Sequence, residues 1–338
     1  MPNHTAGELA SFLGCSLQGD DSVALRGVAS PELAGPADLI YVDSPRHLER
    51  VLQSRSRCVI TSSESAAPGK TSIIATRPKL MFARAAAWLL PPPRIAQGVH
   101  PTAVIARSAR LGRGTGIGPF AVIEEEVELG DETQIGPYCF VGRGARIGKN
   151  CLLYPRVTLY AGVSMGDNVI VHSGAVLGCD GFGYVTAEGT HWKFPQAGGL
   201  EIADDVEIGA NATVARGSLG TTLLSRQVKI DNIVHVAHNV QIGERTLVAA
   251  QTGIAGSSVI EDDVIIGGQV GIADHCRLES GSVAGAQSGI PSGKVIREGE
   301  TVWGTPARPI ARFKRQYGWF SRLPELAERV RKLEERAK

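Results

Sequence analysis

The sequence predicts a mainly β protein in which a long parallel β-helix joins a small N-terminal α/β domain to a C-terminal helical segment. Three observations support this prediction. A six-residue period of aliphatic residues runs through the middle of the chain, both flanks lack that period, and 41 of the 338 residues are glycine whereas only 5% are aromatic. Frequent tight turns and a core of small and β-branched side chains would produce such a composition.

Composition also bounds the function. The chain has 35 basic and 34 acidic residues, so its overall charge gives no reason to expect nucleic acid as a partner. Its six cysteines are scattered without a CxxC pair, which favours reduced thiols. The first residues do not resemble a secretion signal, and no run reaches the ~18 apolar residues of a membrane span. We therefore expect a soluble, cytoplasmic protein with no transmembrane segment.

Residues 1–95 lack the period and predict the α/β domain. The runs Asp38–Val42 and Arg57–Thr61 are typical of strands. Lys79–Leu90 has a helical pattern that ends at the prolines of residues 91–93. A small domain followed by a proline linker is the interpretation.

Residues 96–304 carry the period. Every sixth residue from Val99 to Leu177 is large and aliphatic, and the pattern returns between Ile202 and Ile296. This period matches neither an α-helix nor a simple alternation, but it fits short strands separated by turns, each with one aliphatic side chain in a narrow core. Three strands complete a triangular coil, so the roughly thirty hexads predict about ten coils.

One long stretch, Gly178–Gly199, interrupts the repeat and contains four aromatic residues, Phe182, Tyr184, Trp192 and Phe194. Long loops on a regular scaffold are usually functional. We expect a loop with a binding role, and simple covering of a sheet edge is the alternative.

Residues 305–338 predict the helical segment. Leu323, Leu326, Val330 and Leu333 form an apolar stripe at helical spacing, which would close the end of the solenoid or pack against a second chain. From residue 303 onward there are ten basic and four acidic residues. Such a basic end suits a small acidic carrier protein, although a solvated helix face is the alternative interpretation.

Two histidines are candidate catalytic residues. His238 follows the inward-facing Val236 by two positions, near a turn, and His275 comes almost two coils later. The two imidazoles should therefore lie on the same face, about 10 Å apart. A neutral imidazole can accept a proton near neutral pH, and Asp231, one strand earlier, could orient the ring. Spacing alone leaves open that both are ordinary surface histidines.

No cofactor and no metal ion is expected. The chain has no GxxxxGKS or GxxxxGKT phosphate loop, so its glycines serve turns. His235 and His238 are three residues apart with no cysteine beside them, which does not favour a zinc site.

Six motifs are more specific than the period: PKLMFARAAAWLLPPP (78–93), DGFGY (180–184), WKFPQ (192–196), KIDNIVHVAHNVQIG (229–243), GIAGS (253–257) and RLPEL (322–326). Together they resemble the UDP-3-O-(3-hydroxyacyl)glucosamine N-acyltransferases of lipid A biosynthesis over nearly the whole chain. The resemblance implies a left-handed β-helix and a homotrimer. It also implies transfer of a 3-hydroxyacyl chain from acyl carrier protein to the 2-amino group of UDP-3-O-acylglucosamine.

The same resemblance implies roles for residues of the repeat. His238 falls on the family's general base, the backbone N–H of Gly256 on its oxyanion donor, and His275 on a substrate-positioning histidine. We also expect Asp231 to be a substrate-binding residue. Neither a cofactor nor an acyl-enzyme is implied.

The family's uridine-binding trio of Phe, Asn and Tyr corresponds here to Tyr41, Ser44 and His47, so residues 1–95 would recognise uridine. Because the amide and the third aromatic ring of that trio have changed, a different nucleotide amino sugar remains an alternative. Another hexapeptide-repeat acyl- or acetyltransferase, or a non-catalytic β-helix scaffold, remains open as well.

Overall fold

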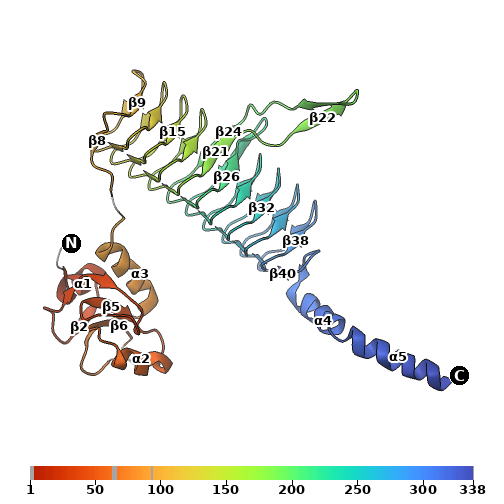
Figure 1. The fold of residues 1–338 in the computed structure, drawn as a ribbon, viewed down its shortest axis with the longest axis horizontal. Helices are drawn as coiled ribbons and strands as arrows, with labels where there is room; N and C mark the ends of the chain where they lie inside the picture. The colour runs from red at the N-terminus through yellow and green to blue at the C-terminus, as the bar shows by residue number, and fades with distance from the viewer. Residues whose placement is uncertain (1–3, 63–66, 93, 338) are drawn as a thin grey trace. The chain divides into compact units, whose positions relative to one another are not determined.

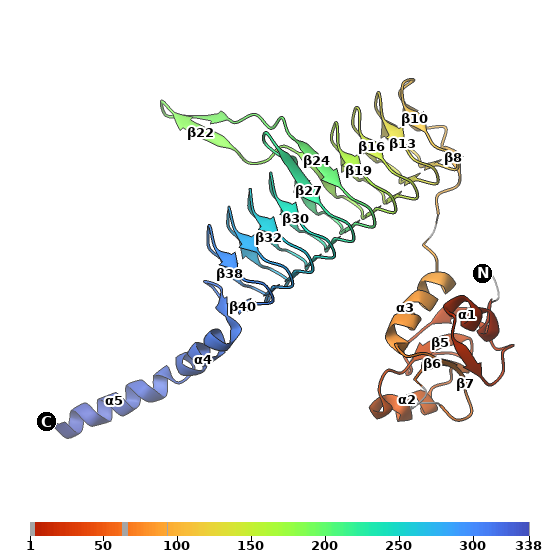
Figure 2. The same cartoon turned by 180° about the vertical axis from the view of Figure 1, so that it is seen from behind.

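The structure is a computed structural model that describes residues 4–62, 67–92 and 94–337. The chain divides into two compact units, Met1–Arg94 and Ile95–Lys338. Pro93 and Lys338, which end the predicted linker and helical segment, lie outside the described residues. Figure 1 and Figure 2 show the two units from opposite sides.

The N-terminal unit is built around a five-stranded sheet in the order β2-β7-β6-β5-β4, in which only β2 runs antiparallel to its neighbour. Its elements are β1 (His4–Thr5), α1 (Ala6–Leu13), β2 (Ser16–Gln18), β3 (Ala24–Leu25), β4 (Gly27–Val28), β5 (Asp38–Tyr41), the 3-10 helix η1 (Pro45–His47), α2 (Leu48–Gln53), β6 (Cys58–Thr61), β7 (Thr71–Ile74) and α3 (Pro78–Leu89). The predicted strands and the predicted helix correspond to β5, β6 and α3.

Local sequence explains where these helices begin and end. Thr5 and Glu8 form a capping box at the start of α1, and Gly14 takes the left-handed conformation that ends it. Pro78 occupies the first turn of α3, where a missing N–H costs nothing. The core of this unit includes the buried side chains of Leu9 and Ile60.

The second unit is a left-handed parallel β-helix with three faces, as predicted. Face 1 contains β8 (Gly98–Val99), β11 (Gly116–Ile117), β14 (Gln134–Ile135), β17 (Leu152–Leu153), β20 (Ile170–Val171), β25 (Glu207–Ile208), β28 (Lys229–Ile230), β31 (Leu247–Val248), β34 (Ile265–Ile266), β37 (Val283–Ala284), β40 (Thr301–Trp303) and the antiparallel β41 (Arg308–Pro309). Face 2 contains β9 (Val104–Ile105), β12 (Val122–Ile123), β15 (Phe140–Val141), β18 (Thr158–Leu159), β21 (Val176–Cys179), β26 (Thr213–Ala215), β29 (His235–Val236), β32 (Gly253–Ile254), β35 (Gly271–Ile272) and β38 (Gly289–Ile290). Face 3 contains β10 (Arg110–Leu111), β13 (Glu128–Leu129), β16 (Arg146–Ile147), β19 (Ser164–Met165), β24 (Gly199–Ile202), β27 (Thr221–Leu224), β30 (Gln241–Ile242), β33 (Val259–Ile260), β36 (Arg277–Leu278) and β39 (Val295–Ile296).

The period is the cause of this architecture. In each short strand of the coils the second residue points inward, so Val236, Ile254 and Ile272 stack in consecutive coils and are all buried. The first residue points outward and forms a column on the face. Faces 2 and 3 contain ten strands each, in agreement with the predicted number of coils.

The interruption at Gly178–Gly199 is not a simple loop. It forms an antiparallel hairpin of β22 (Tyr184–Ala187) and β23 (Thr190–Lys193), which we call the arm (Figure 1). Glu188 and Gly189 both have positive φ angles, as a tight two-residue hairpin turn requires. All eight strand residues of the arm are exposed.

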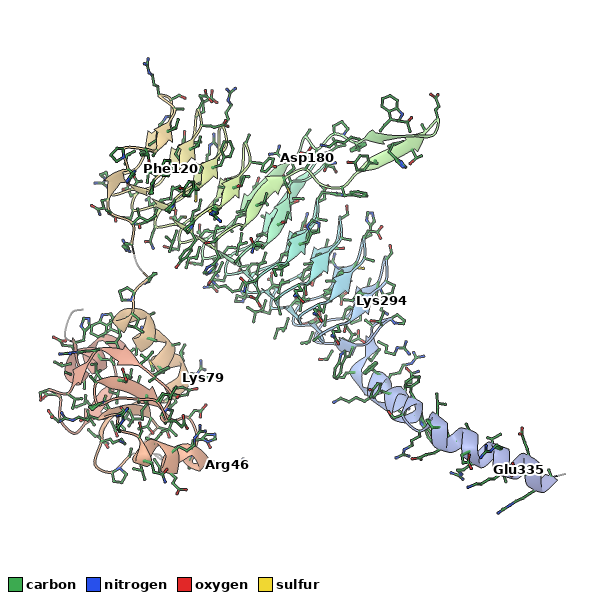
Figure 3. The ribbon with its side chains drawn as sticks, viewed as in Figure 1. Arg46, Lys79, Phe120, Asp180, Lys294 and Glu335 are labelled. Atoms are coloured by element: carbon green, nitrogen blue, oxygen red, sulfur yellow. The ribbon has the colours of Figure 1, made fainter. Side chains whose placement is uncertain are left out.

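The C-terminal segment is helical, as predicted, and contains α4 (Ile310–Phe320) and α5 (Leu323–Ala337). Trp303 packs its ring against Phe313, which joins α4 to the last coil. Figure 3 draws the side chains of the two helices and labels Glu335 on α5. Neither helix buries a residue. The apolar stripe of α5 therefore does not close the solenoid in a single chain, and its packing against a second chain stays a prediction. No helix in the described ranges is long and apolar enough to cross a membrane.

Candidate active site

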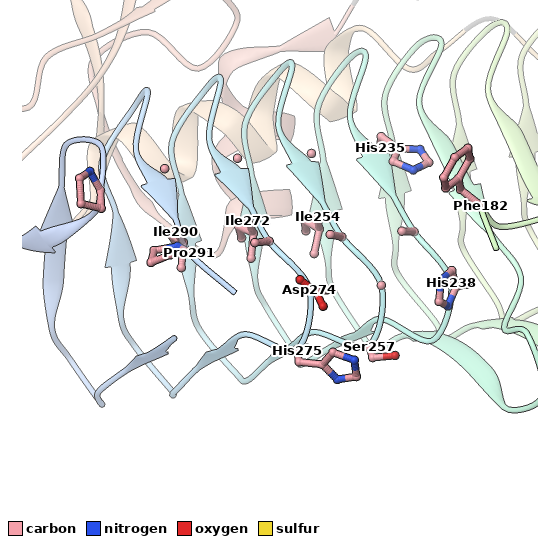
Figure 4. A pocket seen from close by; sticks show the side chains of 18 of the residues that line it. Phe182, His235, His238, Ile254, Ser257, Ile272, Asp274, His275, Ile290 and Pro291 are labelled. Atoms are coloured by element: carbon pink, nitrogen blue, oxygen red, sulfur yellow. The ribbon is translucent and has the colours of Figure 1, made fainter. Parts of the chain in front are cut away.

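A groove of about 890 Å³ runs along face 2 over the coils of β29, β32, β35 and β38 (Figure 4). Figure 4 shows His235, His238 and Phe182 at one end and Ile290 and Pro291 at the other. The groove therefore follows the axis of the solenoid rather than one coil.

Its floor is made by the outward column of face 2. Thr213 and His235 occupy this column in successive coils, and the next three positions are Gly253, Gly271 and Gly289. A Cβ added at Gly253 or Gly271 would meet no atom within 4 Å. The missing side chains leave an open trough that begins at His235 and is lined largely by apolar atoms.

His238 lies in the turn that follows β29, at the corner between faces 2 and 3. Its Nδ1 atom is 3.0 Å from Oδ1 of Asn239. The same oxygen accepts hydrogen bonds from the backbone N–H and the hydroxyl of Ser218, at 3.0 and 2.8 Å. An amide oxygen can only accept, so Nδ1 of the neutral ring carries the proton and Nε2 keeps a free lone pair. The arrangement presents Nε2 as a proton acceptor.

Two glycines make room for this ring. A Cβ on Gly256 would lie 2.7 Å from Cε1 and 2.8 Å from Nε2 of His238. A Cβ on Gly181 would lie 2.7 Å from the Cβ atom of His238. Any larger residue at either position would displace the imidazole. The ring is thus packed between the next coil and the root of the arm.

The backbone around Gly256 leaves one donor unused. The N–H groups of its neighbours Ala255 and Ser257 donate to Ile272 and to His238, and its own carbonyl accepts from His275. The N–H of Gly256 has no partner within the described residues. Gly256 packs against the imidazole of His238, and a free backbone N–H on such a residue can stabilise a developing oxyanion.

His275 also lines the groove, at the next corner position after Asp274. Its φ angle of 54° places it in the left-handed conformation of the corner. A hydrogen bond from the hydroxyl of Ser292 lowers the pKa of Asp274, and the nearby His275 adds a smaller electrostatic contribution. Asp274 is therefore ionised at neutral pH and is the carboxylate of this groove.

The arm contributes to the same end of the groove. Phe182 lines it although the ring is largely exposed, and an ion pair between Asp180 and Lys193 closes the base of the arm. The Oε1 atom of Gln196 lies 2.8 Å from the position that a Cβ on Gly181 would occupy. The arm is therefore anchored beside His238.

Asp231 does not orient His238, which corrects the expectation from the sequence. Its Oδ1 atom accepts from the backbone and side-chain N–H groups of Asn232, and its Oδ2 atom accepts from the N–H of Ala250. It lines a separate pocket of about 740 Å³ on face 1, with His172 and Lys229. The expectation for Asp231 was wrong because the order of strands along the chain does not tell toward which face the side chain of a corner residue points. Asn239 does the orienting instead.

The remaining predicted residues lie in the N-terminal unit. Tyr41 and His47 line a pocket of about 530 Å³, whereas Ser44 caps η1 and accepts from the N–H of Arg46. One face of Tyr41 packs against Phe82, with ring centroids 4.7 Å apart. The structure thus groups Tyr41 with His47 and does not bring Ser44 into that pocket.

Sequence reasoning missed Asn239, Gly181 and Asp274 as members of the site. Asn239 is adjacent to His238 in the motif, and a side-chain amide next to a candidate base was a usable signal. Gly181 gave no such signal, because its contact with His238 spans 57 positions and depends on how the arm folds back. No three His, Cys, Asp or Glu side chains of the described part are grouped as metal ligands would be.

Comparison with known families gives two matches. Residues 22–88 match the family UDP-3-O-(3-hydroxymyristoyl) glucosamine N-acyltransferase, LpxD. Residues 144–179 match the bacterial transferase hexapeptide repeat. The first match lies in the N-terminal unit and the second in the β-helix.

Similar proteins cover nearly the whole chain. A UDP-3-O-acylglucosamine N-acyltransferase of Syntrophobacter fumaroxidans is 51% identical over 99% of this chain and 94% of its own length. One of Pseudomonas aeruginosa is 39% identical over 99% of this chain and 95% of its own length. Among solved structures, an Arabidopsis UDP-N-acetylglucosamine acyltransferase has a TM-score of 0.56 at 24% identity, covering 63% of this chain and 73% of that one.

Proposed function

The chain belongs to the family of UDP-3-O-acylglucosamine N-acyltransferases of lipid A synthesis, and from that premise we propose that it transfers a 3-hydroxyacyl chain from acyl carrier protein to the 2-amino group of UDP-3-O-acylglucosamine. The observation that carries this proposal is the setting of His238. Its protonated Nδ1 is held by Asn239, and its ring packs against Gly256, whose N–H is unused, in an open groove.

The proposed reaction needs only these groups. The amine nitrogen attacks the thioester carbon while Nε2 of His238 takes a proton from the nitrogen. The carbonyl oxygen becomes an oxyanion that accepts a hydrogen bond from Gly256 N–H. Collapse of the tetrahedral intermediate forms the amide, breaks the C–S bond and releases the carrier's thiol, which receives the proton from His238. No cysteine acts as a nucleophile, and Cys276 points into the core.

His275 is proposed to position the substrate, because it lines the groove one coil beyond Gly256. Asp231 is on face 1, and it would reach a groove on face 2 only if a second chain supplied it. We therefore propose a homotrimer in which face 1 of one copy lies against face 2 of the next. The exposed apolar side chains of Leu247 and Ile265 on face 1 support a covered surface there.

The C-terminal helices are the proposed docking surface for acyl carrier protein. Arg312, Lys314, Arg315 and Arg322 are exposed and have no acidic partner within the described residues. Unpaired cations at one end of a nearly neutral protein would steer an acidic partner. All six cysteines are unpaired, which is compatible with the reducing cytoplasm as the place of action.

The pocket of Tyr41 and His47 is proposed to bind the uridine of the acceptor. It offers an aromatic ring supported by Phe82 and an imidazole, with Arg50 on its wall. A ring face and polar groups suit a nucleobase. Because Ser44 and His47 replace the amide and the third aromatic ring of the family's trio, a different nucleotide amino sugar is the alternative acceptor.

One assay tests the proposal as a whole. Purified protein is incubated with UDP-3-O-acylglucosamine and either 3-hydroxyacyl-carrier protein or acetyl-CoA, and the N-acylated product is measured. We expect product with the carrier protein alone. Product with acetyl-CoA would support the alternative of a hexapeptide acetyltransferase. Absence of product with both donors, also when a second nucleotide amino sugar is offered as the acceptor, would support a scaffold.

A further inference from the structure

His235 is the third imidazole that lines the groove, and the proposed chemistry gives it no role. It is the outward residue of β29, three positions before His238, and it lines the same end of the groove. The next three positions of its column are glycines. His235 is therefore the last side chain at the head of the trough.

Its ring nitrogens have no hydrogen-bond partner within the residues that the structure describes. Desolvation by the surrounding protein lowers the pKa of His235 below its ordinary value. The ring is thus neutral at neutral pH, and a neutral imidazole offers one donor and one acceptor. A group that both accepts and donates, such as an alcohol, is its natural complement.

The proposed acyl chain carries such a group. Its hydroxyl sits on carbon 3, two bonds from the thioester carbon that must lie at His238 and Gly256. An alcohol that enters an apolar trough loses water and must find a new hydrogen bond. The other titratable side chains of the trough lie at its corner: His238 is the base, and Asp274 and His275 follow β35 in the turn two coils further along. His235 alone stands on the floor.

We propose that His235 hydrogen-bonds the 3-hydroxyl of the acyl donor and makes the enzyme selective for 3-hydroxyacyl over plain acyl chains. This inference rests on the proposed function. It assigns His235 to specificity and leaves proton transfer to His238. A site built around a substrate hydroxyl rejects the analogue without it, because the site's polar group is then left unpaired.

The test compares two carrier-protein donors of equal chain length, one with and one without the 3-hydroxyl. The kcat/KM ratio for the two donors is measured for the wild type, His235→Leu, His235→Gln and the control Thr213→Leu. Thr213 holds the same outward position one coil earlier and does not line the groove. Both positions are on the surface of the coil, so folding should survive each change, as circular dichroism would verify.

We expect the wild type to prefer the hydroxylated donor by about tenfold or more. His235→Leu should remove that preference by slowing only the hydroxylated donor. His235→Gln should keep part of it, since an amide can also donate and accept, and Thr213→Leu should match the wild type. Equal slowing of both donors in His235→Leu, or a preference that survives it, would overturn the inference.

Two further outcomes separate this inference from the function on which it rests. If the wild type uses both donors equally well, the N-acyltransferase function stands and the role of His235 is wrong. If the wild type uses neither donor, the proposed function is wrong and the role of His235 falls with it.

Discussion

Oδ1 of Asn239 lies 3.0 Å from Nδ1 of His238, and two donors from Ser218 fix which atom of the amide faces the ring. A flipped amide would set its NH₂ group against the N–H of Ser218, so the oxygen must face both residues. The tautomer of His238 therefore follows from a hydrogen-bond network that begins at Ser218, in the corresponding corner of the preceding coil.

Removing this acceptor should impair catalysis more than folding. Asn239 has a φ angle of 59°, so Asn239→Gly keeps the backbone conformation while it deletes the side chain. We expect kcat to fall roughly 10²-fold with little change in KM, because the ring loses its tautomer and orientation. Asn239→Asp, which keeps an acceptor, should retain much more activity.

Asn211→Gly is the matched control for Asn239→Gly. Asn211 has a φ of 55° at another corner and lines none of the described pockets. It should match the wild type in kcat and share only the small loss of melting temperature. Full activity in Asn239→Gly would show that Asn239 does not set the tautomer.

Replacing His238 itself should have the largest effect. If its Nε2 accepts the amine proton, His238→Ala and His238→Gln should lower kcat/KM by about 10² to 10⁴-fold, as loss of a general base does. Neither change should lower the melting temperature much, because the side chain is only partly buried. Steady-state rates with the carrier-protein donor decide this, and a variant that keeps more than a tenth of the activity would exclude general base catalysis by His238.

The sequence predicts the scaffold better than the site, for a physical reason. Each coil repeats one local rule, an inward aliphatic such as Val236 or Ile254, and a local rule can be recognised from a single chain. The site depends on contacts between coils and between the arm and a coil. The meeting of Gly181 with His238 is such a contact, and no periodicity encodes it.

The arm shows what local signals can still provide. The alternation in Tyr184–Ala187 and Thr190–Lys193, separated by Glu188 and Gly189, is typical of a two-residue hairpin, yet its aromatic content favoured a binding loop in our interpretation. The prediction for Asp231 was wrong because a local signal was given too much weight. The residue is polar and close to His238 in sequence, but the corner between them turns it onto face 1.

The glycine that packs against the imidazole of His238 should be irreplaceable. A Cβ at Gly256 would lie 2.7 Å from Cε1 of His238, closer than carbon atoms can approach. Gly256→Ala should therefore push the ring away and lower kcat at least tenfold, while the backbone, which has an ordinary φ there, stays folded. Gly199→Ala is the control, because its nearest contact would be an ordinary 3.6 Å. Equal activity of the two variants would contradict the packing of His238 on Gly256.

The buried thiols should make the protein less stable at alkaline pH. Burial raises the pKa of Cys139 and of Cys151 to about 11, whereas an unfolded thiol has a pKa of about 8.5. The stability that these thiols provide is complete below about pH 8.5 and is lost as the pH rises toward 11, by about 1.4 kcal/mol per pH unit for each thiol. Other coils carry Ala121 and Ala145 in the same inward slot, so alanine should fit.

We therefore expect a Cys139→Ala, Cys151→Ala variant to lose less free energy of unfolding between pH 8 and 10.5 than the wild type does. Urea denaturation at several pH values measures the difference. Parallel curves for the two proteins would mean that these thiols ionise without unfolding. Alkylating reagents at pH 7 should leave the activity of the wild type unchanged, because every cysteine pKa is raised by burial.

Charge on α4 should control use of the carrier protein and not of the nucleotide sugar. Replacing Arg312, Lys314 and Arg315 by glutamate reverses a cluster that is exposed and without acidic partners in the described part of the chain. The KM for the acyl-carrier donor should rise about tenfold or more, and its dependence on salt should weaken, because steering by opposite charges is screened by ions. The KM for UDP-3-O-acylglucosamine should not change. A reversal of Arg107, Arg110 and Arg113, at the other end of the β-helix, changes the total charge equally and should leave both constants as they are, although Arg110 and Arg113 pair with Glu128 and Asp131. If both triple variants raised the donor KM equally, general charge rather than a docking surface on α4 would explain recognition of the carrier.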